Sequence, residues 1–127
     1  MLSDKKVYAV MTATDLERAK KFYTENLGLK LTKEDDWSFS VEAGGGTAIY
    51  IYLKDEAPKA ENTQVSFKVS DIESEVEDLT GKGVAFEHYD MPEMGIKTND
   101  KGIAEMGSTK SAWFKDTEGN ILGLNQM

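Results

Sequence analysis

The chain has 127 residues, of which 15 are Lys or Arg and 23 are Asp or Glu, so its formal net charge is −8. That length suits one ordinary domain, and the acidic balance disfavours nucleic acid, because binding a phosphate backbone requires clustered cations. The absence of cysteine excludes disulfides, thiolate nucleophiles and thiolate-bound zinc, and the single histidine, His88, excludes sites that require two imidazoles. No apolar run approaches the roughly 20 residues of a membrane span, and residues 1–6 lack the apolar stretch of a signal peptide. We therefore expect a cytoplasmic protein with neither a nucleic-acid nor a membrane partner.

The first half of the chain predicts a strand, a helix and three further strands. Residues 7–12 alternate in the manner of a strand. Thr14 and Glu17 then form a capping box, which predicts the start of a helix whose apolar residues continue at helical spacing. Residues 29–33 predict the next strand, and residues 38–53 predict a hairpin that turns at three consecutive glycines.

The second half repeats this order. Residues 65–68 alternate like the first strand, and Ser70 with Glu73 forms a second capping box, 70 − 14 = 56 residues after the first. Residues 84–89 then predict a strand, and residues 111–126 predict a hairpin with a polar turn. The spacing between the two hairpins is larger than the spacing between the two helices, so the second half carries about 18 additional residues.

We therefore predict an α+β fold of two βαβββ modules within one domain that spans residues 1–127. The modules cover residues 4–54 and 63–127, and a polar linker at residues 55–62 joins them. The additional residues form an inserted loop at 92–109, for which a flexible lid and a dimer-contact arm are both open interpretations.

Alternation along the strands gives the predicted sheet two different faces. One face is uniformly apolar and is expected to pack under the helices. The opposite face mixes aromatic and polar side chains, as the wall of a ligand-binding groove would, and the strands around it add further aromatic residues. The candidate ligand-binding residues are Tyr8, Phe39, Tyr50, Tyr52, Gln64, Phe114 and Asn125. Phe39 lies opposite Tyr50 only if Glu42 pairs with Thr47, because a slip of one residue reverses its side. The alternative is that these aromatic side chains simply fill the space inside a small barrel.

Two segments resemble the vicinal oxygen chelate superfamily, which includes glyoxalase I, extradiol dioxygenases, fosfomycin-resistance enzymes and bleomycin-resistance proteins. Residues 15–29 look like the helix-to-Leu-Gly-Leu segment of that family. Residues 113–122 look like its Phe-x-Asp-Pro-x-Gly-Asn hairpin, with Thr117 in the usual Pro place. The resemblance implies paired modules that form a curved mixed sheet, or half-barrel groove, with the helices outside, and it implies a homodimer.

The resemblance also identifies where a metal would bind. Enzymes of the family hold a divalent ion through side chains on the first and last strand of each module, and the matching positions here are Tyr8, Tyr50, Gln64 and Gly123. Two phenols, an amide and a glycine include neither a carboxylate nor an imidazole. We therefore expect no metal and no other cofactor.

These observations favour a metal-free small-molecule-binding protein of the glyoxalase/bleomycin-resistance type. The acidic groove would suit a planar or apolar ligand that is neutral or cationic. The alternative is a glyoxalase-related lyase or isomerase in which His88, Tyr8 or Tyr50 transfers protons. A third class is a structural or regulatory dimer with a filled groove.

Overall fold

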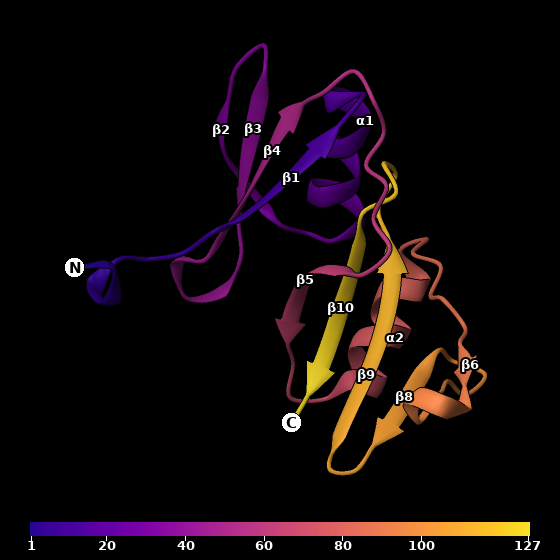
Figure 1. Cartoon of the computed structure of the whole chain (residues 1–127). Coiled ribbons are helices and arrows are strands. Elements are labelled where there is room, and N and C mark those ends of the chain that lie inside the picture. Colours follow the sequence, from indigo (N-terminus) through magenta and orange to yellow (C-terminus); the bar gives the residue numbers. More distant parts are fainter. The chain divides into compact units, whose positions relative to one another are not determined.

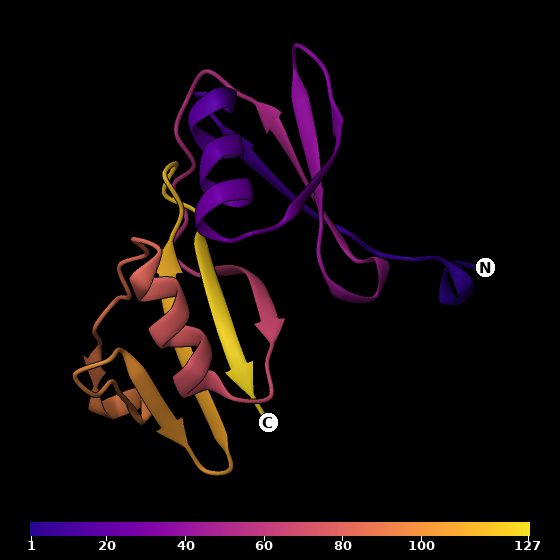
Figure 2. The ribbon, with the colours of Figure 1, turned by 180° about the vertical axis from the view of Figure 1, so that it is seen from behind.

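The computed structural model describes residues 1–127, and the chain forms two compact units, Met1–Pro58 and Lys59–Met127. Each unit contains one four-stranded mixed sheet with a helix packed on one face (Figures 1 and 2). The two sheets have the same strand order, which confirms the predicted α+β class built from a repeated motif. No helix is long and apolar enough to cross a membrane.

The first unit is built on a sheet in the order β1-β4-β3-β2, in which β1 runs parallel to β4 and the other pairs are antiparallel. A short 3₁₀ turn at Leu2–Asp4 precedes the sheet, and the helix α1 continues directly into a turn of π-helix. The elements are β1 at Ala9–Ala13, α1 at Leu16–Lys21, the π-turn at Phe22–Asn26, β2 at Lys30–Glu34, β3 at Ser38–Glu42, a 3₁₀ turn at Gly44–Gly46 and β4 at Ala48–Leu53.

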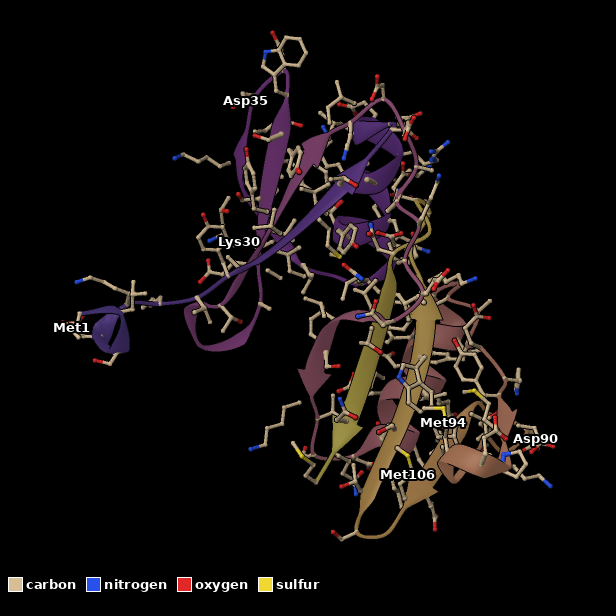
Figure 3. The ribbon with its side chains drawn as sticks, in the orientation of Figure 1. Met1, Lys30, Asp35, Asp90, Met94 and Met106 are labelled. Atoms are coloured by element: carbon tan, nitrogen blue, oxygen red, sulfur yellow. The ribbon has the colours of Figure 1, made fainter.

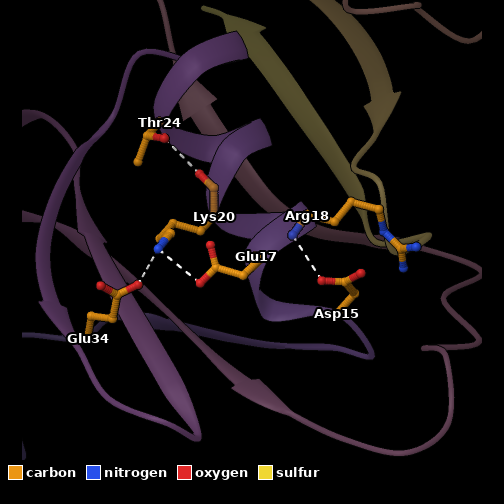
Figure 4. Close-up of polar contacts among 6 residues, drawn as sticks. All are labelled: Asp15, Glu17, Arg18, Lys20, Thr24 and Glu34. Atoms are coloured by element: carbon orange, nitrogen blue, oxygen red, sulfur yellow. Dashed lines mark hydrogen bonds and ion pairs between the residues drawn. The ribbon is translucent and has the colours of Figure 1, made fainter.

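Helix α1 begins one residue later than the capping box predicts. The N-cap is Asp15, whose carboxylate accepts a hydrogen bond from the Arg18 backbone N–H at 3.1 Å (Figure 4). Thr14 instead accepts a hydrogen bond from the Arg18 guanidinium. A carboxylate is favoured at this position because it also interacts with the positive end of the helix dipole.

Lys20 connects α1 with the edge strand β2. Its Nζ lies 2.5 Å from Glu34 Oε2 and 3.1 Å from Glu17 Oε1 (Figure 4). These two carboxylates, Glu34 first, hold the pKa of Lys20 above its ordinary value. The helix therefore fixes the outermost strand of the sheet as well as covering its apolar face.

The predicted register of the first hairpin is wrong by one residue. The glycine turn closes with a hydrogen bond from the Ala43 N–H to the Thr47 carbonyl, so Glu42 pairs with Ala48 and not with Thr47. Phe39 consequently pairs with Ile51 on the helix-covered side of the sheet. It is only 2% exposed, and its ring contacts the ring of Tyr23 at a centroid distance of 6.4 Å.

The second unit has a sheet in the order β5-β10-β9-β8, in which β5 runs parallel to β10. The N-cap of helix α2 is Asp71, whose carboxylate accepts from the Ser74 N–H at 3.2 Å, so here too the cap follows the predicted Ser70 by one residue. The elements are β5 at Thr63–Lys68, α2 at Ile72–Gly81, β6 at Asp90–Met91, a 3₁₀ turn at Pro92–Met94, β7 at Ile96–Lys97, β8 at Ile103–Met106, β9 at Thr109–Lys115 and β10 at Ile121–Gln126.

Two predictions for the middle of this unit are wrong. Residues 84–89 form no strand and contribute only one bridge, between Phe86 and Phe114. The place that β2 holds in the first sheet is taken by β8, which lies within the segment 92–109 expected to be a loop. β7 also lies in this segment and pairs with β6, which directly precedes it, and the exposed Met94 lies in the turn between them (Figure 3). Ile103 and Ala104 explain the position of β8, because both are buried there.

Helix α2 packs on the sheet of its unit through apolar and polar contacts. Phe114 pairs with Leu122 on the helix-covered side and is fully buried, with the ring of Phe86 at 5.5 Å. At the margin of this core, Lys110 Nζ lies 2.9 Å from Glu73 Oε1. This hydrogen bond lowers the pKa of the Glu73 carboxyl and raises the pKa of the Lys110 amine.

Candidate functional site

The first unit leaves one face of its sheet without a helix, and this face carries aromatic side chains. Ile49 and Ile51 of β4 point under the helix, so the alternate residues Tyr50 and Tyr52 point to the open side. Their rings stack at a centroid distance of 6.2 Å with an interplanar angle of 29°. Val10 of β1 pairs with Tyr50 and is 50% exposed, so it adds aliphatic area beside the two rings.

Tyr8 lies just before the first residue of β1 and is 63% exposed. It has the same alternation as Val10 and precedes it by two residues, so it continues the open-face row beyond the hydrogen-bonded part of the sheet. The structure therefore brings Tyr50 and Tyr52 together as predicted and leaves Tyr8 outside that stacked pair.

The open face of the second sheet is more polar at one end and aromatic at the other. Asn125 of β10 accepts a hydrogen bond from the Ser111 hydroxyl of β9 at 2.5 Å. Gln64 lies beside an irregularity in the β5–β10 pairing and donates to the Asn62 carbonyl at 3.3 Å. Of these two predicted residues, Asn125 belongs to a hydrogen-bonded pair of the sheet face and Gln64 is an exposed edge residue.

Sequence reasoning missed an aromatic pair on this second face. The rings of Trp113 and Tyr89 meet edge to face, with centroids 5.5 Å apart and planes at 69°. Trp113 pairs with Gly123. The sequence could have indicated this pairing, because the turn before β10 determines the register of the hairpin. Tyr89 could not have been found in this way, because it lies outside any strand.

His88 lies on the other side of the chain from its neighbour Tyr89. It borders an open depression of about 590 Å³ beside α2, with apolar residues beneath and charged residues at the rim. The lining includes Val76, Val84, Phe86, Asp100 and Lys101. His88 is exposed there, on the helix side of the second unit, whereas Trp113 belongs to the open face.

The comparisons with known proteins agree with this architecture. The family model of the Glyoxalase/Bleomycin resistance protein/Dioxygenase superfamily matches residues 6–124. The chain belongs to this superfamily. The match confirms the family that the helix and closing hairpin segments indicate.

Solved structures of the superfamily share the fold along nearly the whole chain. A glyoxalase family protein from Enterococcus faecalis is 20% identical with a TM-score of 0.72, and the match covers 98% of this chain and 99% of that one. TnmS3, an antibiotic binding protein from Streptomyces sp. CB03234, is 21% identical with a TM-score of 0.69 and 97% of each chain covered. Fosfomycin resistance protein FosX from Mesorhizobium loti is 12% identical with a TM-score of 0.66, covering 98% and 92%. A search of curated proteins gave no match.

The residues at the superfamily's metal positions do not fit a divalent ion. Tyr50 is stacked against Tyr52, Tyr8 is a second phenol, and Gln64 donates its amide N–H to a backbone carbonyl. Gly123 offers no side chain at all, and a Cβ built there would lie 3.0 Å from Ser66 Oγ. The structure contains no group of three or more His, Cys, Asp or Glu side chains placed to hold a metal ion.

Proposed function

We propose that this protein binds a small molecule without a metal, and that the ligand is planar or apolar and either neutral or cationic. The observation that carries the proposal is the stacked pair Tyr50–Tyr52 on the open face of the first sheet. A stacked, partly exposed aromatic pair offers apolar area together with hydroxyl groups that can orient a ligand.

The charge of the chain supports the ligand class. The net charge of −8 attracts cations and repels anions at long range. The only arginine is Arg18, so a site that holds a carboxylate or phosphate through several bidentate arginine clamps is not available. Among the similar solved structures, one is described as antibiotic binding, which is consistent with this kind of ligand.

No specific observation favours the enzyme alternative. To transfer a proton at an aromatic open face, the His88 imidazole would have to lie on that face. Within the second unit, His88 instead borders the depression next to α2. We therefore propose binding rather than catalysis. The homodimer and the cytoplasmic location are further proposals that rest on the sequence and the family resemblance.

The binding proposal can be tested with bleomycin and with proflavine, a planar aromatic cation, by thermal shift and calorimetry in the presence of EDTA. We expect at least one of the two to raise the melting temperature, and EDTA to leave the effect unchanged. Removing the ring in Tyr50→Ala should lower affinity about tenfold or more. Tyr50→Ala should reduce the free energy of unfolding by less than the roughly 3–5 kcal/mol that truncation of an aromatic core residue costs.

Tyr50→Phe serves as the matched control, because it keeps the ring and should keep most of the affinity. If Tyr50→Ala instead destabilises by the full core amount and neither compound binds, the open face is packed core and the proposal is wrong. Binding that disappears in EDTA would show that a metal is required.

A further inference from the structure

The residues inserted into the second unit form most of the depression that His88 borders on the helix side. Twenty-one residues lie between α2 and β8, whereas three residues lie between the π-turn and β2 in the first unit. Six of the nine residues that line the depression of about 590 Å³ belong to this longer segment. The insertion therefore creates the depression, and all of its lining belongs to the second unit.

The floor of the depression is apolar and supported by the core. Val76 of α2 and Val84 are 2% and 4% exposed, and Phe86 is half-buried. The Phe86 ring meets the Phe114 ring edge to face at a centroid distance of 5.5 Å, and the two residues form a β-bridge. The floor is thus held from below, and its exposed part offers apolar surface to a ligand.

A second wall is the turn at residues 99–102, which is fixed before any ligand arrives. Asn99 Oδ1 accepts from the backbone N–H groups of Lys101 at 2.9 Å and Ile103 at 3.0 Å. The Gly102 N–H donates to the Asn99 carbonyl at 3.0 Å. Gly102 has a φ of +87°, and a Cβ built on it would lie 2.9 Å from Phe86 Cβ. The turn therefore packs directly against the floor, and this wall is pre-organised.

Both signs of charge are present around the apolar floor. The ionisable residues that line the depression are Glu77, His88, Asp100 and Lys101. All four are exposed, and none of their side chains forms a hydrogen bond or an ion pair within the chain. Acceptors and donors without partners, beside one apolar surface, favour a ligand that carries an ammonium, a carboxylate and an apolar group.

We propose that this depression binds a hydrophobic α-amino acid in its zwitterionic form, apart from the open faces of the sheets. The apolar side chain of the ligand lies against Phe86 in the floor. Lys101 and His88 donate to the carboxylate of the ligand. Asp100 and Glu77 accept from its ammonium. A zwitterion has no net charge, so the net charge of −8 does not repel it as it repels a simple anion.

The single histidine makes the depression directly observable. His88 is the only histidine, so the imidazole C–H signals of a proton NMR spectrum come from this site alone. In the unaltered protein at neutral pH, L-phenylalanine should shift these signals saturably with a Kd of about a millimolar, as expected for a small ligand in an open site. Phenylpropanoate lacks the ammonium and phenylethylamine lacks the carboxylate. Each should bind about fivefold more weakly or worse, because each loses one set of charge-assisted hydrogen bonds.

Two substitutions at the rim test the assigned partners in opposite ways. Lys101→Gln should weaken L-phenylalanine and phenylpropanoate about fivefold and should not weaken phenylethylamine. Asp100→Asn should weaken L-phenylalanine and phenylethylamine and should not weaken phenylpropanoate. The matched controls are Lys97→Gln and Asp90→Asn, which make the same charge changes at exposed, paired positions of β7 and β6 outside the depression (Figure 3). Both controls should bind all three compounds like the parent.

The results decide whether the site exists and what it takes. If L-phenylalanine at roughly ten times the expected Kd leaves the His88 signals unmoved, the site is wrong. If either single-charge analogue binds as tightly as L-phenylalanine, the ligand is not a zwitterion and the proposal is wrong. Equal losses in the rim variants and their controls would show a general effect of charge and would also overturn it. The analogue comparison uses the unaltered protein, so it decides even if a rim variant does not fold.

One further variant separates this site from the proposed function. Tyr50→Ala should leave the affinity for L-phenylalanine unchanged, and a loss there would place this ligand on the open face and overturn the inference. If the parent binds neither proflavine nor bleomycin while the His88 signals respond to L-phenylalanine, the proposed function fails and the site on the helix side stands.

Discussion

At the residue scale, one buried carboxylate organises the turn that places Trp113 opposite Gly123. Asp116 Oδ1 accepts from the backbone N–H groups of Glu118 at 2.9 Å and Asn120 at 2.8 Å, and Oδ2 accepts from the Asn120 side chain at 2.8 Å. The sequence predicts a polar turn in this hairpin, and the Asp116 carboxylate supplies the acceptor that closes it. Because a slip of one residue moves every side chain of a strand to the other face, this turn also determines which residues reach the open side.

Replacing Asp116 with alanine is therefore expected to reduce the free energy of unfolding by about 2–4 kcal/mol. Two backbone amides and the buried Asn120 side chain would lose their shared acceptor. Urea unfolding followed by circular dichroism measures the change. Thr117→Ser, in the same turn, keeps the hydroxyl that donates to Glu118 Oε2 at 2.9 Å and should stay within about 0.5 kcal/mol. Equal effects of the two substitutions would contradict this account of the turn.

At the element scale, the two helices begin in the same way, and in both the capping residue is an aspartate. Asp15 and Asp71 accept from the N–H groups three residues later, whereas the capping boxes point to Thr14 and Ser70. The difference is one residue in each case. Either side chain can serve as an N-cap, and at these two helices the carboxylate does so.

Asp71→Ala is expected to lower the free energy of unfolding by about 1 kcal/mol, because the Ser74 N–H loses its acceptor and the helix loses a favourable charge. Ser70→Ala should change it by less than about 0.5 kcal/mol. Thermal and urea unfolding of the two variants in parallel give the comparison. If Ser70→Ala lowers the free energy of unfolding more than Asp71→Ala does, Ser70 is the N-cap, as the sequence predicts.

The sequence predicts the elements of this fold better than their connections. The apolar patterns and turn residues predict β1, α1, β3, β4 and the β9–β10 hairpin. The four-residue strand β8 is too short to show alternation, so its segment was predicted as a loop. The register of the first hairpin was missed because consecutive glycines permit more than one closure of the turn.

The same limits explain which site residues were missed. Phe39 and Phe114 were predicted on the groove side, and their cross-strand partners Ile51 and Leu122 place them on the helix side instead. Tyr50 and Tyr52 were predicted together because their alternation within one strand is unambiguous. The Tyr89–Trp113 contact depends on Thr98, nine residues along the chain from Tyr89, and no local pattern encodes it.

At the scale of the whole molecule, the two sheets have corresponding edge strands, each with one side that pairs with no other strand of its sheet. The order is β1-β4-β3-β2 in one unit and β5-β10-β9-β8 in the other, so β1 and β5 are both edge strands. Such edges present unpaired backbone groups, which proteins commonly cover by association or by other elements. Val10 and Tyr52, at 50% and 38% exposure, add apolar area on the open face of the first sheet.

We therefore expect a homodimer, as the family resemblance also implies, with a mass near 2 × 14.1 = 28.2 kDa at micromolar concentration. Size-exclusion chromatography with light scattering measures this mass directly. Because each copy carries a net charge of −8, repulsion between copies opposes association at low salt, whereas apolar burial is not screened. Raising the ionic strength should consequently strengthen the dimer, and dilution at low salt should release monomer. A 14.1 kDa particle at every salt concentration would reject the dimer, and dissociation by salt would show that ion pairs, rather than apolar surface, hold the copies together.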